Sequence, residues 1–72
     1  MHEGEVRQFA TNVVRARKAA KLTQEQVSER SGVHVTEVSR IERGLRDPRM
    51  TTLIRMARAL DVSPANLLDG VK

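Results

Sequence analysis

The sequence predicts an all-α fold, a compact domain of five short helices. Apolar residues recur at three- and four-residue spacing in five successive stretches, and no stretch shows the alternation typical of a strand. Glycine and proline number only four and two among 72 residues, so few positions interrupt a helix. A chain of this length forms one domain with a small core, and we expect residues 1–72 to be that single unit.

The first helix is expected over about residues 5–20. Val6, Phe9 and Val13 form an apolar stripe along one face. Acidic residues stand near its start and basic residues near its end, which is the arrangement that the helix dipole favours. Residues 1–4 before it and residues 70–72 at the other end of the chain are expected to be frayed tails.

The next two helices are short and close together. Thr23 and Gln26 have the spacing of a capping box, which begins a helix, and Gly32 suits the end of that helix. Another helix is expected over residues 35–43, with a glycine as its stop. The short turn between the two forces a wide crossing angle, so about residues 23–43 are expected to form a helix-turn-helix. Four apolar residues are expected to fill its wedge: Val27, Val33, Val38 and Ile41.

The last two helices follow a turn that contains Pro48. The fourth is expected over about residues 51–60, where apolar residues again have helical spacing. Ser63 can cap the fifth helix, and Pro64 then occupies the first helical position, which proline favours. Gly70 is the expected stop.

The composition excludes several classes of protein. No cysteine occurs, so the chain has no disulfide and no thiolate site, which fits a cytoplasmic protein. Phe9 is the only aromatic residue, so a protein that stacks single-stranded bases on exposed rings is not indicated. No apolar run is long enough to span a membrane, and the first residues lack the pattern of a signal peptide.

Catalytic and metal sites are not expected either. His2 and His34 have no partner at metal-ligand spacing. No glycine-rich phosphate loop occurs, and a chain this short has little room for a catalytic cleft. We therefore expect no enzymatic activity, no metal and no cofactor, and no small-molecule effector is evident.

The charge is basic and unevenly distributed. Lysine and arginine number 13 against 9 acidic residues, which gives a formal net charge of +4. Residues 40–58 alone hold six arginines and two acidic residues, so the whole net charge is concentrated there. This concentration favours a polyanionic partner near the end of the third helix.

The same central segment resembles a known family. The matching residues are Leu22–Ser28, Ser31–Val33, Val38–Gly44 and Pro48. They resemble the phage repressor/Cro family of helix-turn-helix domains, also called the xenobiotic-response-element family, and the resemblance covers about residues 9–69. Two residues depart from the family pattern: Ser28 replaces the usual alanine, and His34 stands where serine or threonine usually caps the third helix. Imidazole is a poorer cap, so we expect that end of the helix to fray or to be capped in another way.

The resemblance implies a lambda repressor-like DNA-binding domain that places its third helix in the major groove of double-stranded DNA, with two copies on a palindromic operator. The positions that touch base edges in this family correspond to Val35, Thr36, Ser39 and Arg40. Thr23 and Gln24 begin the helix that crosses the phosphate backbone, and Arg43 occupies a position of phosphate contact. Arg17 and Glu42 occupy the positions of a partly buried ion pair that joins the first and third helices.

The chemistry of these residues supports the roles and leaves some of them open. Arg40 can pair bidentately with guanine O6 and N7, or contact a phosphate instead. Arg43 and Arg46 are interpreted as phosphate contacts, with solvated surface charge as the alternative. Gln24 can donate its amide to a phosphate at the helix N-terminus, or serve only as a polar residue there. Glu37 can accept a hydrogen bond from a cytosine amine, although nearby phosphates repel a carboxylate.

A single recognition helix makes few contacts, so we expect a homodimer whose two recognition helices reach successive major grooves. Because we expect residues 1–72 to form a single domain, the fourth and fifth helices are the expected source of the interface. The candidate interface residues are Ile54, Val62, Leu68 and Val71. Alternatively, these residues complete the core of the monomer. The compact plan resembles the small controller proteins of restriction–modification systems and stand-alone prophage-type regulators.

The expected function is therefore that of a dimeric, sequence-specific DNA-binding transcriptional regulator. The main alternative is an antitoxin-like module that uses the same fold to bind a partner protein. A non-specific architectural nucleic-acid binder is the third hypothesis, but it calls for more lysine and fewer base-reading residues.

Overall fold

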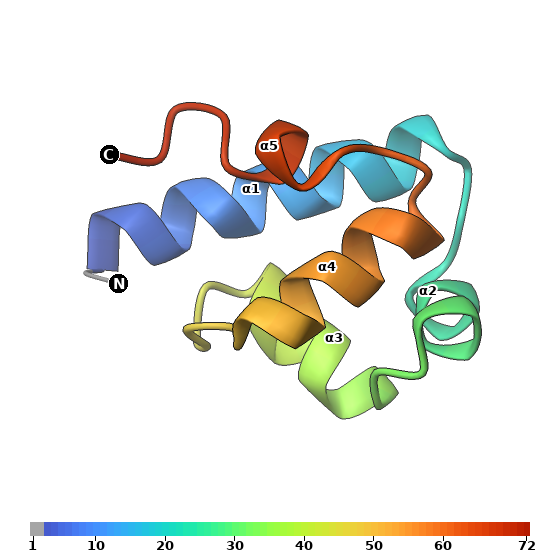
Figure 1. Ribbon diagram of the computed structural model, residues 1–72. Coiled ribbons are helices and arrows are strands. Elements are labelled where there is room, and N and C mark those ends of the chain that lie inside the picture. Colours follow the sequence, from blue (N-terminus) through green and yellow to red (C-terminus); the bar gives the residue numbers. More distant parts are fainter. Residues whose placement is uncertain (1–2) are drawn as a thin grey trace.

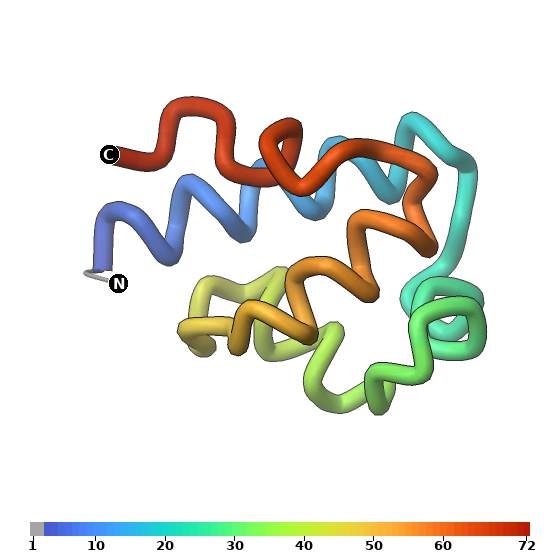
Figure 2. Tube along the Cα trace, in the orientation of Figure 1, coloured from blue at the N-terminus to red at the C-terminus, as the bar shows by residue number. Residues whose placement is uncertain are grey.

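The computed structural model describes residues 3–72 and has the expected all-helical architecture of five helices. The helices are α1 (Glu3–Ala19), α2 (Gln24–Ser31), α3 (Val35–Glu42), α4 (Met50–Ala59) and α5 (Pro64–Leu67). The longest helix, α1, lies beside α5 and the C-terminal segment, and α2, α3 and α4 gather on its other side (Figure 1). The start of α1 and the C-terminal residue lie on the same side of the molecule (Figure 2).

Helix α1 begins earlier than its apolar pattern indicates. Glu3 and Gly4 are helical, so the expectation that residues 1–4 fray is wrong for these two, and Met1 and His2 lie outside the described residues. The Glu3 carboxylate accepts a hydrogen bond of 2.7 Å from Arg7, one turn further along. Acidic side chains in the first turn and pairs at this spacing both favour a helix, which accounts for the additional residues.

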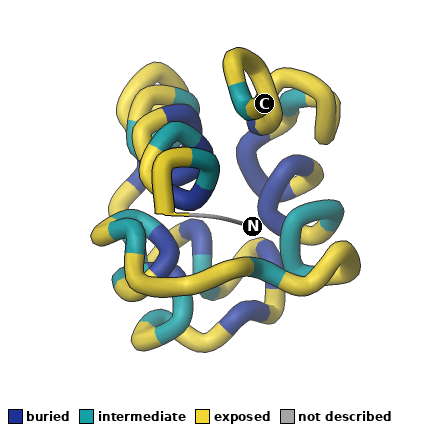
Figure 3. Tube along the Cα trace, turned by 90° about the vertical axis from the view of Figure 1, so that its left-hand side faces the viewer, coloured by how far each residue is buried: buried dark blue, intermediate teal, exposed yellow. Residues whose placement is uncertain are grey.

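The core is one cluster of buried residues to which all five helices contribute. The buried parts of the chain face the middle of the molecule in Figure 3. The largest fully buried members of the cluster are Phe9, Val13, Val27, Val38, Ile41, Met56 and Leu67. The four residues predicted to fill the wedge of the helix-turn-helix are all buried, as expected. Full burial of one such side chain stabilises a fold by about 1.5–3 kcal/mol, so a domain this small depends on each of them.

Helix α2 begins and ends where the local sequence predicts. The Thr23 hydroxyl accepts a hydrogen bond of 3.0 Å from the Gln26 backbone N–H, and the Gln26 side chain accepts one of 2.9 Å from the Thr23 N–H. At the other end of α2, Gly32 adopts φ +74° and donates its N–H to the Ser28 carbonyl. Only glycine adopts this left-handed conformation without strain, so the predicted capping box and stop are both present.

His34 caps α3 with an imidazole nitrogen in place of a hydroxyl. Its Nδ1 accepts a hydrogen bond of 3.1 Å from the Thr36 backbone N–H. This end of α3 was expected either to fray or to be capped in another way. The structure has the second outcome, because α3 is regular from Val35 onward.

The C-terminal segment is anchored to α1 by a buried asparagine. The Asn12 side chain donates hydrogen bonds of 2.9 Å to the Leu67 carbonyl and 2.7 Å to the Asp69 carbonyl. Val71, two residues beyond, is half-buried and packs against the core. The expectation that residues 70–72 fray is therefore wrong for Val71, because its apolar side chain has a surface to cover.

Two residues other than glycine adopt left-handed backbone conformations within residues 3–72. Lys21 has φ +59° after α1, and Asp61 has φ +56° after α4. Each donates its N–H to a carbonyl in the last turn of the preceding helix, Lys18 and Arg58 respectively, at 3.0 and 3.1 Å. This conformation costs an L-amino acid about 1–2 kcal/mol, so two helix ends are closed under strain.

No helix among residues 3–72 has both the length and the apolar character needed to cross a membrane. In the same stretch, no group of three histidine, cysteine or acidic side chains is placed to hold a metal ion. His2, considered above as a metal ligand, lies outside the described residues.

Candidate nucleic-acid interface

Helix α3 turns an apolar face to the core and a polar face to solvent. Val38 and Ile41 are fully buried and fix α3 against α1 and α2. The residues predicted to contact bases share the other face because of their helical spacing, and they are Val35, Thr36, Ser39 and Arg40. Thr36 and Arg40 are exposed, and Val35 and Ser39 are half-buried.

The polar groups on this face are open to a ligand. Among the described residues, none of these four side chains forms a hydrogen bond or an ion pair. A guanidinium, two hydroxyls and the methyl groups of a valine on one helix face are groups that read base edges in a major groove. The geometry of α3 is therefore suited to sequence recognition.

The start of α2 carries the residues predicted to contact the DNA backbone. Thr23 is exposed, and its hydroxyl already serves as the helix cap. Gln24 is half-buried, and its Nε2 donates a hydrogen bond of 3.0 Å to Glu42. One N–H of Gln24 therefore joins α2 to α3, and its second N–H is left for another acceptor.

Arg17 and Glu42 lie behind the α3 face and connect three helices. Arg17 Nε and Nη2 donate to the two oxygens of the Glu42 carboxylate at 2.7 and 3.0 Å, and Nη1 donates to the Leu22 carbonyl at 2.9 Å. The hydrogen bond to Glu42 raises the pKa of Arg17 above its usual value. Together with Gln24, this pair holds α1, α2 and α3 in a fixed relation.

The two arginines predicted to contact phosphates differ in their surroundings. Arg43 is exposed at the end of α3, and its Nε donates a hydrogen bond of 3.4 Å to the Ser39 carbonyl. Arg46, in the loop before α4, forms an ion pair of 3.1 Å with Glu37. This pairing offsets the charge of the one carboxylate in the first turn of α3, which would otherwise repel phosphates.

The candidate dimer residues are divided between core and surface. Val62 and Val71 are half-buried and pack against the core, so they serve the monomer at least in part. Ile54 is half-buried, and Leu68 is 39% exposed. Two further apolar residues, Leu45 and Met50, are 64% and 77% exposed at the two ends of the α3–α4 loop.

Sequence reasoning missed two contacts at this surface, Gln24 with Glu42 and Glu37 with Arg46. The partners are 18 and 9 residues apart, on different elements, and no helical spacing rule connects them. The cap by His34 was within reach of sequence analysis, because an unprotonated imidazole nitrogen is a hydrogen-bond acceptor.

Comparisons with known proteins all point to one family. A protein-family model described as helix-turn-helix matches residues 13–67. The control protein C.SmaI of Serratia marcescens is 42% identical over 60 residues, which cover 83% of this chain and 71% of that protein. The antitoxin HigA1 of Mycobacterium tuberculosis is 40% identical over 57 residues, 79% of this chain and 38% of that protein.

A solved structure has the same fold. The crystal structure of the restriction-modification controller protein C.AhdI from Aeromonas hydrophila matches with a TM-score of 0.86 at 30% identity, over 89% of this chain and 97% of that one. The chain spans as little as 31% of the length of the curated relatives that it matches, so parts of those proteins have no counterpart here.

Proposed function

Since the chain belongs to the Cro/C1-type helix-turn-helix family of DNA-binding transcriptional regulators, we propose that it acts as a homodimer on a palindromic operator. In this proposal α3 enters the major groove and reads the base sequence of double-stranded DNA. Such a regulator works in the cytoplasm, where its DNA lies.

One observation carries the proposal: the arrangement of side chains on the solvent-facing side of α3. Arg40 and Thr36 are exposed side by side with Val35 and Ser39, on a helix held from behind by buried residues and by the pair of Arg17 with Glu42. A rigid helix with an unengaged guanidinium positions that group for a bidentate contact with guanine.

Phosphate contacts are assigned to both ends of this helix pair. Gln24 is at the first position of α2, and one N–H of its side chain remains available beyond the hydrogen bond to Glu42. The backbone amides at this helix N-terminus also favour an anion. Arg43 and Arg46 follow the recognition face at its other end. Contacts of this kind position the protein on the duplex and make binding salt-dependent.

Dimerisation is assigned to the α4–α5 side of the domain. Leu68 is exposed and Ile54 is half-buried, and Val62 and Val71 are half-buried and pack against the core. Two copies would present their recognition helices to successive major grooves, about 34–36 Å apart or a multiple of that distance.

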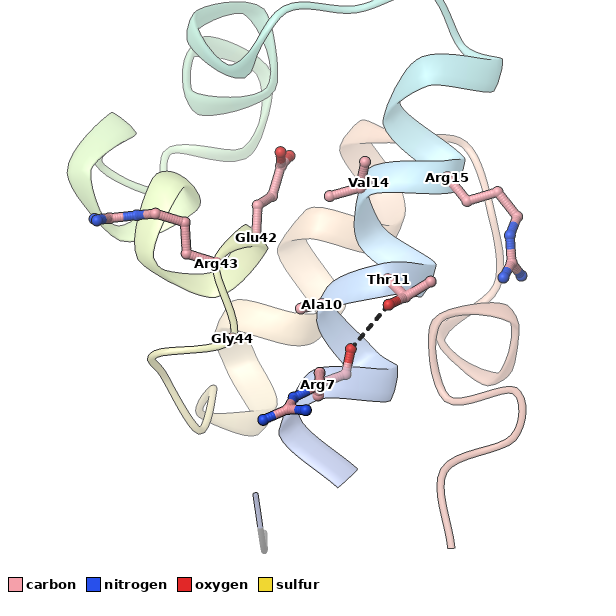
Figure 4. Close-up of a pocket in the computed structure, with 8 residues that line it drawn as sticks. All are labelled: Arg7, Ala10, Thr11, Val14, Arg15, Glu42, Arg43 and Gly44. Carbon is pink, nitrogen blue, oxygen red and sulfur yellow. Dashed lines mark hydrogen bonds between the residues drawn. The ribbon is translucent and has the colours of Figure 1, made fainter. Parts of the chain in front are cut away.

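Selection of bound duplexes from a random library, at a stated salt concentration, tests the proposal. We expect a palindrome whose half-sites are separated by about one helical turn, 10–10.5 base pairs. Arg15→Ala, an exposed arginine on α1 (Figure 4), is the control and should select the same sequence. Enrichment of a single half-site would contradict the dimer, and no enrichment would contradict sequence-specific recognition.

Oligomeric state is measured separately by sedimentation equilibrium with and without the selected duplex. Leu68→Glu introduces a charge at an exposed position, so the monomer should fold normally. We expect this variant to shift the protein toward monomer, because a carboxylate is not buried in an apolar interface without cost.

A second candidate function is an antitoxin-like module, which the similarity to HigA1 favours. The two functions give opposite results in the selection experiment. A chain whose main role is to bind a partner protein would enrich no duplex, whereas a regulator would enrich one.

A further inference from the structure

A shallow hollow lies between α1 and the end of the recognition helix. Its volume is about 360 Å³, and its lining includes Arg7, Ala10 and Val14 from α1 and Arg43 and Gly44 from the end of α3. Figure 4 shows these elements facing each other across the hollow. A Cβ atom placed on Gly44 would lie 3.8 Å from the Arg7 Cα, so α1 passes close beside the residue that follows Arg43.

An anion at this end of α3 cannot be bound by the backbone. The N–H groups of Arg43, Gly44 and Leu45 all donate to carbonyls within α3, those of Ser39, Ile41 and Arg40. The C-terminal end of a helix also carries a partial negative charge, which disfavours a phosphate. A phosphate here therefore requires cationic side chains to hold it.

Two arginines from different helices supply that charge. Figure 4 shows the Arg7 and Arg43 side chains extending to the same side, whereas Arg15, which also lines the hollow, extends its guanidinium away from them on the opposite side of α1. Glu42 also lines the hollow, but Arg17 and Gln24 already bind its carboxylate. The net charge that faces the mouth of the hollow is therefore positive.

On the basis of the proposed function, we infer that Arg7 of α1 is a further DNA-contacting residue, which binds the same stretch of phosphate backbone as Arg43. The footprint of the domain then extends beyond the helix-turn-helix to the first helix. The recognition helix is thereby held on its duplex from α1 as well as from α2.

In the free protein, Arg7 is paired with Glu3 at 2.7 Å. Both side chains are largely exposed, at 74% and 84%, so this pair is weak and competes poorly with a phosphate. Glu3 therefore opposes DNA binding by occupying Arg7. Its removal is expected to strengthen binding.

The experiment compares two variants that remove the same charge from the same helix. Arg7→Ala and Arg15→Ala are assayed in the chain of residues 1–72 against the selected duplex across a range of salt concentrations. Arg7→Ala should weaken binding about five- to tenfold and lower the slope of log K against log salt by about 1, and Arg15→Ala should leave both nearly unchanged. Glu3→Gln should tighten binding about twofold. Circular dichroism melting checks that all three variants fold.

The outcomes separate the inference from the proposed function. Equal effects of Arg7→Ala and Arg15→Ala, whether both lose affinity or neither does, would overturn the role of Arg7 while leaving the regulator intact. Failure of the unsubstituted protein to bind any duplex would overturn both. Loss of affinity in Arg7→Ala with an unchanged salt slope would also contradict a phosphate contact.

Discussion

Arg17 of α1 and Glu42 of α3 are joined by two parallel hydrogen bonds, 2.7 and 3.0 Å long, in a site where their side chains are only 17% and 5% exposed. An ion pair buried to this degree differs from one at the surface, because either partner left alone keeps a charge away from water. The pair therefore makes the position of α3 depend on α1.

Glu42→Ala should lower the free energy of unfolding by about 2–4 kcal/mol, because Arg17 then remains buried without a counter-ion. Urea denaturation measures the change. Glu3→Ala removes the exposed pair with Arg7 and is the matched control, with no measurable loss of stability expected. Equal stability of the two variants would show that the buried pair does not hold the fold. The binding free energy of the folded Glu42→Ala variant for DNA should change less than its free energy of unfolding.

The pH dependence of this pair follows from the raised pKa of Arg17. A cation whose pKa is raised on folding stabilises the protein at every pH below the pKa of the unfolded chain, and it loses that contribution only as the pH rises through the pKa of the folded protein. Arginine stays protonated far above neutral pH. Unfolding by urea at pH 7 and pH 10 should therefore show the same contribution from Arg17. A difference between the wild-type protein and Arg17→Met that shrinks over this interval would contradict this assignment.

Arg40→Ala and Arg43→Ala should weaken DNA binding in different ways. Loss of Arg40 removes a base contact, so it should cost about 1–3 kcal/mol and relax the preference at one base position. Loss of Arg43 should weaken all sequences alike and reduce the salt slope by about 1. Repeating the duplex selection with each variant separates the two effects. Uniform losses for both would mean that Arg40 also contacts phosphate.

Replacement of Lys21 or Asp61 by glycine should stabilise the domain. Both have positive φ at a helix end, and glycine removes a strain of about 1–2 kcal/mol at the expense of some chain entropy, which leaves a net gain of about 0.5–1 kcal/mol each. Urea midpoints measure the gain. Gly32→Ala makes the opposite change, because it places a Cβ atom at a position with positive φ. That Cβ meets no atom within 4 Å, so any loss of stability comes from the backbone strain at φ +74° alone.

Asn12→Ala should destabilise the domain by about 2 kcal/mol, because the Leu67 and Asp69 carbonyls lose their donor and the first of these hydrogen bonds is buried. The amide of Val71 should also exchange with solvent faster, which hydrogen exchange measures. Gln8→Ala removes the hydrogen bond that Asn12 accepts, 3.0 Å long and partly buried, but leaves the Leu67 and Asp69 carbonyls their donor, so a smaller effect is expected. If both variants have equal effects, the anchoring role of Asn12 is incorrect.

The sequence was most informative where structure is local. The capping box of Thr23 with Gln26, the left-handed Gly32 and the buried wedge residues depend on spacing within a few positions, and all were predictable. The family resemblance then correctly indicated the all-helical fold and the class of regulator. The roles assigned to individual DNA-contacting residues stay predictions.

The predictions from the sequence that were wrong depend mostly on contacts between distant segments of the chain. Nothing near Asn12 in the sequence indicates that its side chain binds carbonyls 55 and 57 residues away. Without knowledge of that contact, Val71 is predicted to belong to a frayed C-terminus, although it packs against the core. The early start of α1 was missed for a different reason, since Glu3 and Gly4 carry no apolar signal and are ordered by charge.

The anchorage of Leu67 and Asp69 to Asn12 also has a consequence for synthesis. Because α1 is made first and its partner segment last, a growing chain lacks these contacts until residue 69 has been added. Folding of this domain is therefore completed only after nearly the whole of it has left the ribosome. A chain truncated within α5 would lack the carbonyls that Asn12 binds and the buried Leu67 side chain, so we expect it to be less stable and more open to proteolysis.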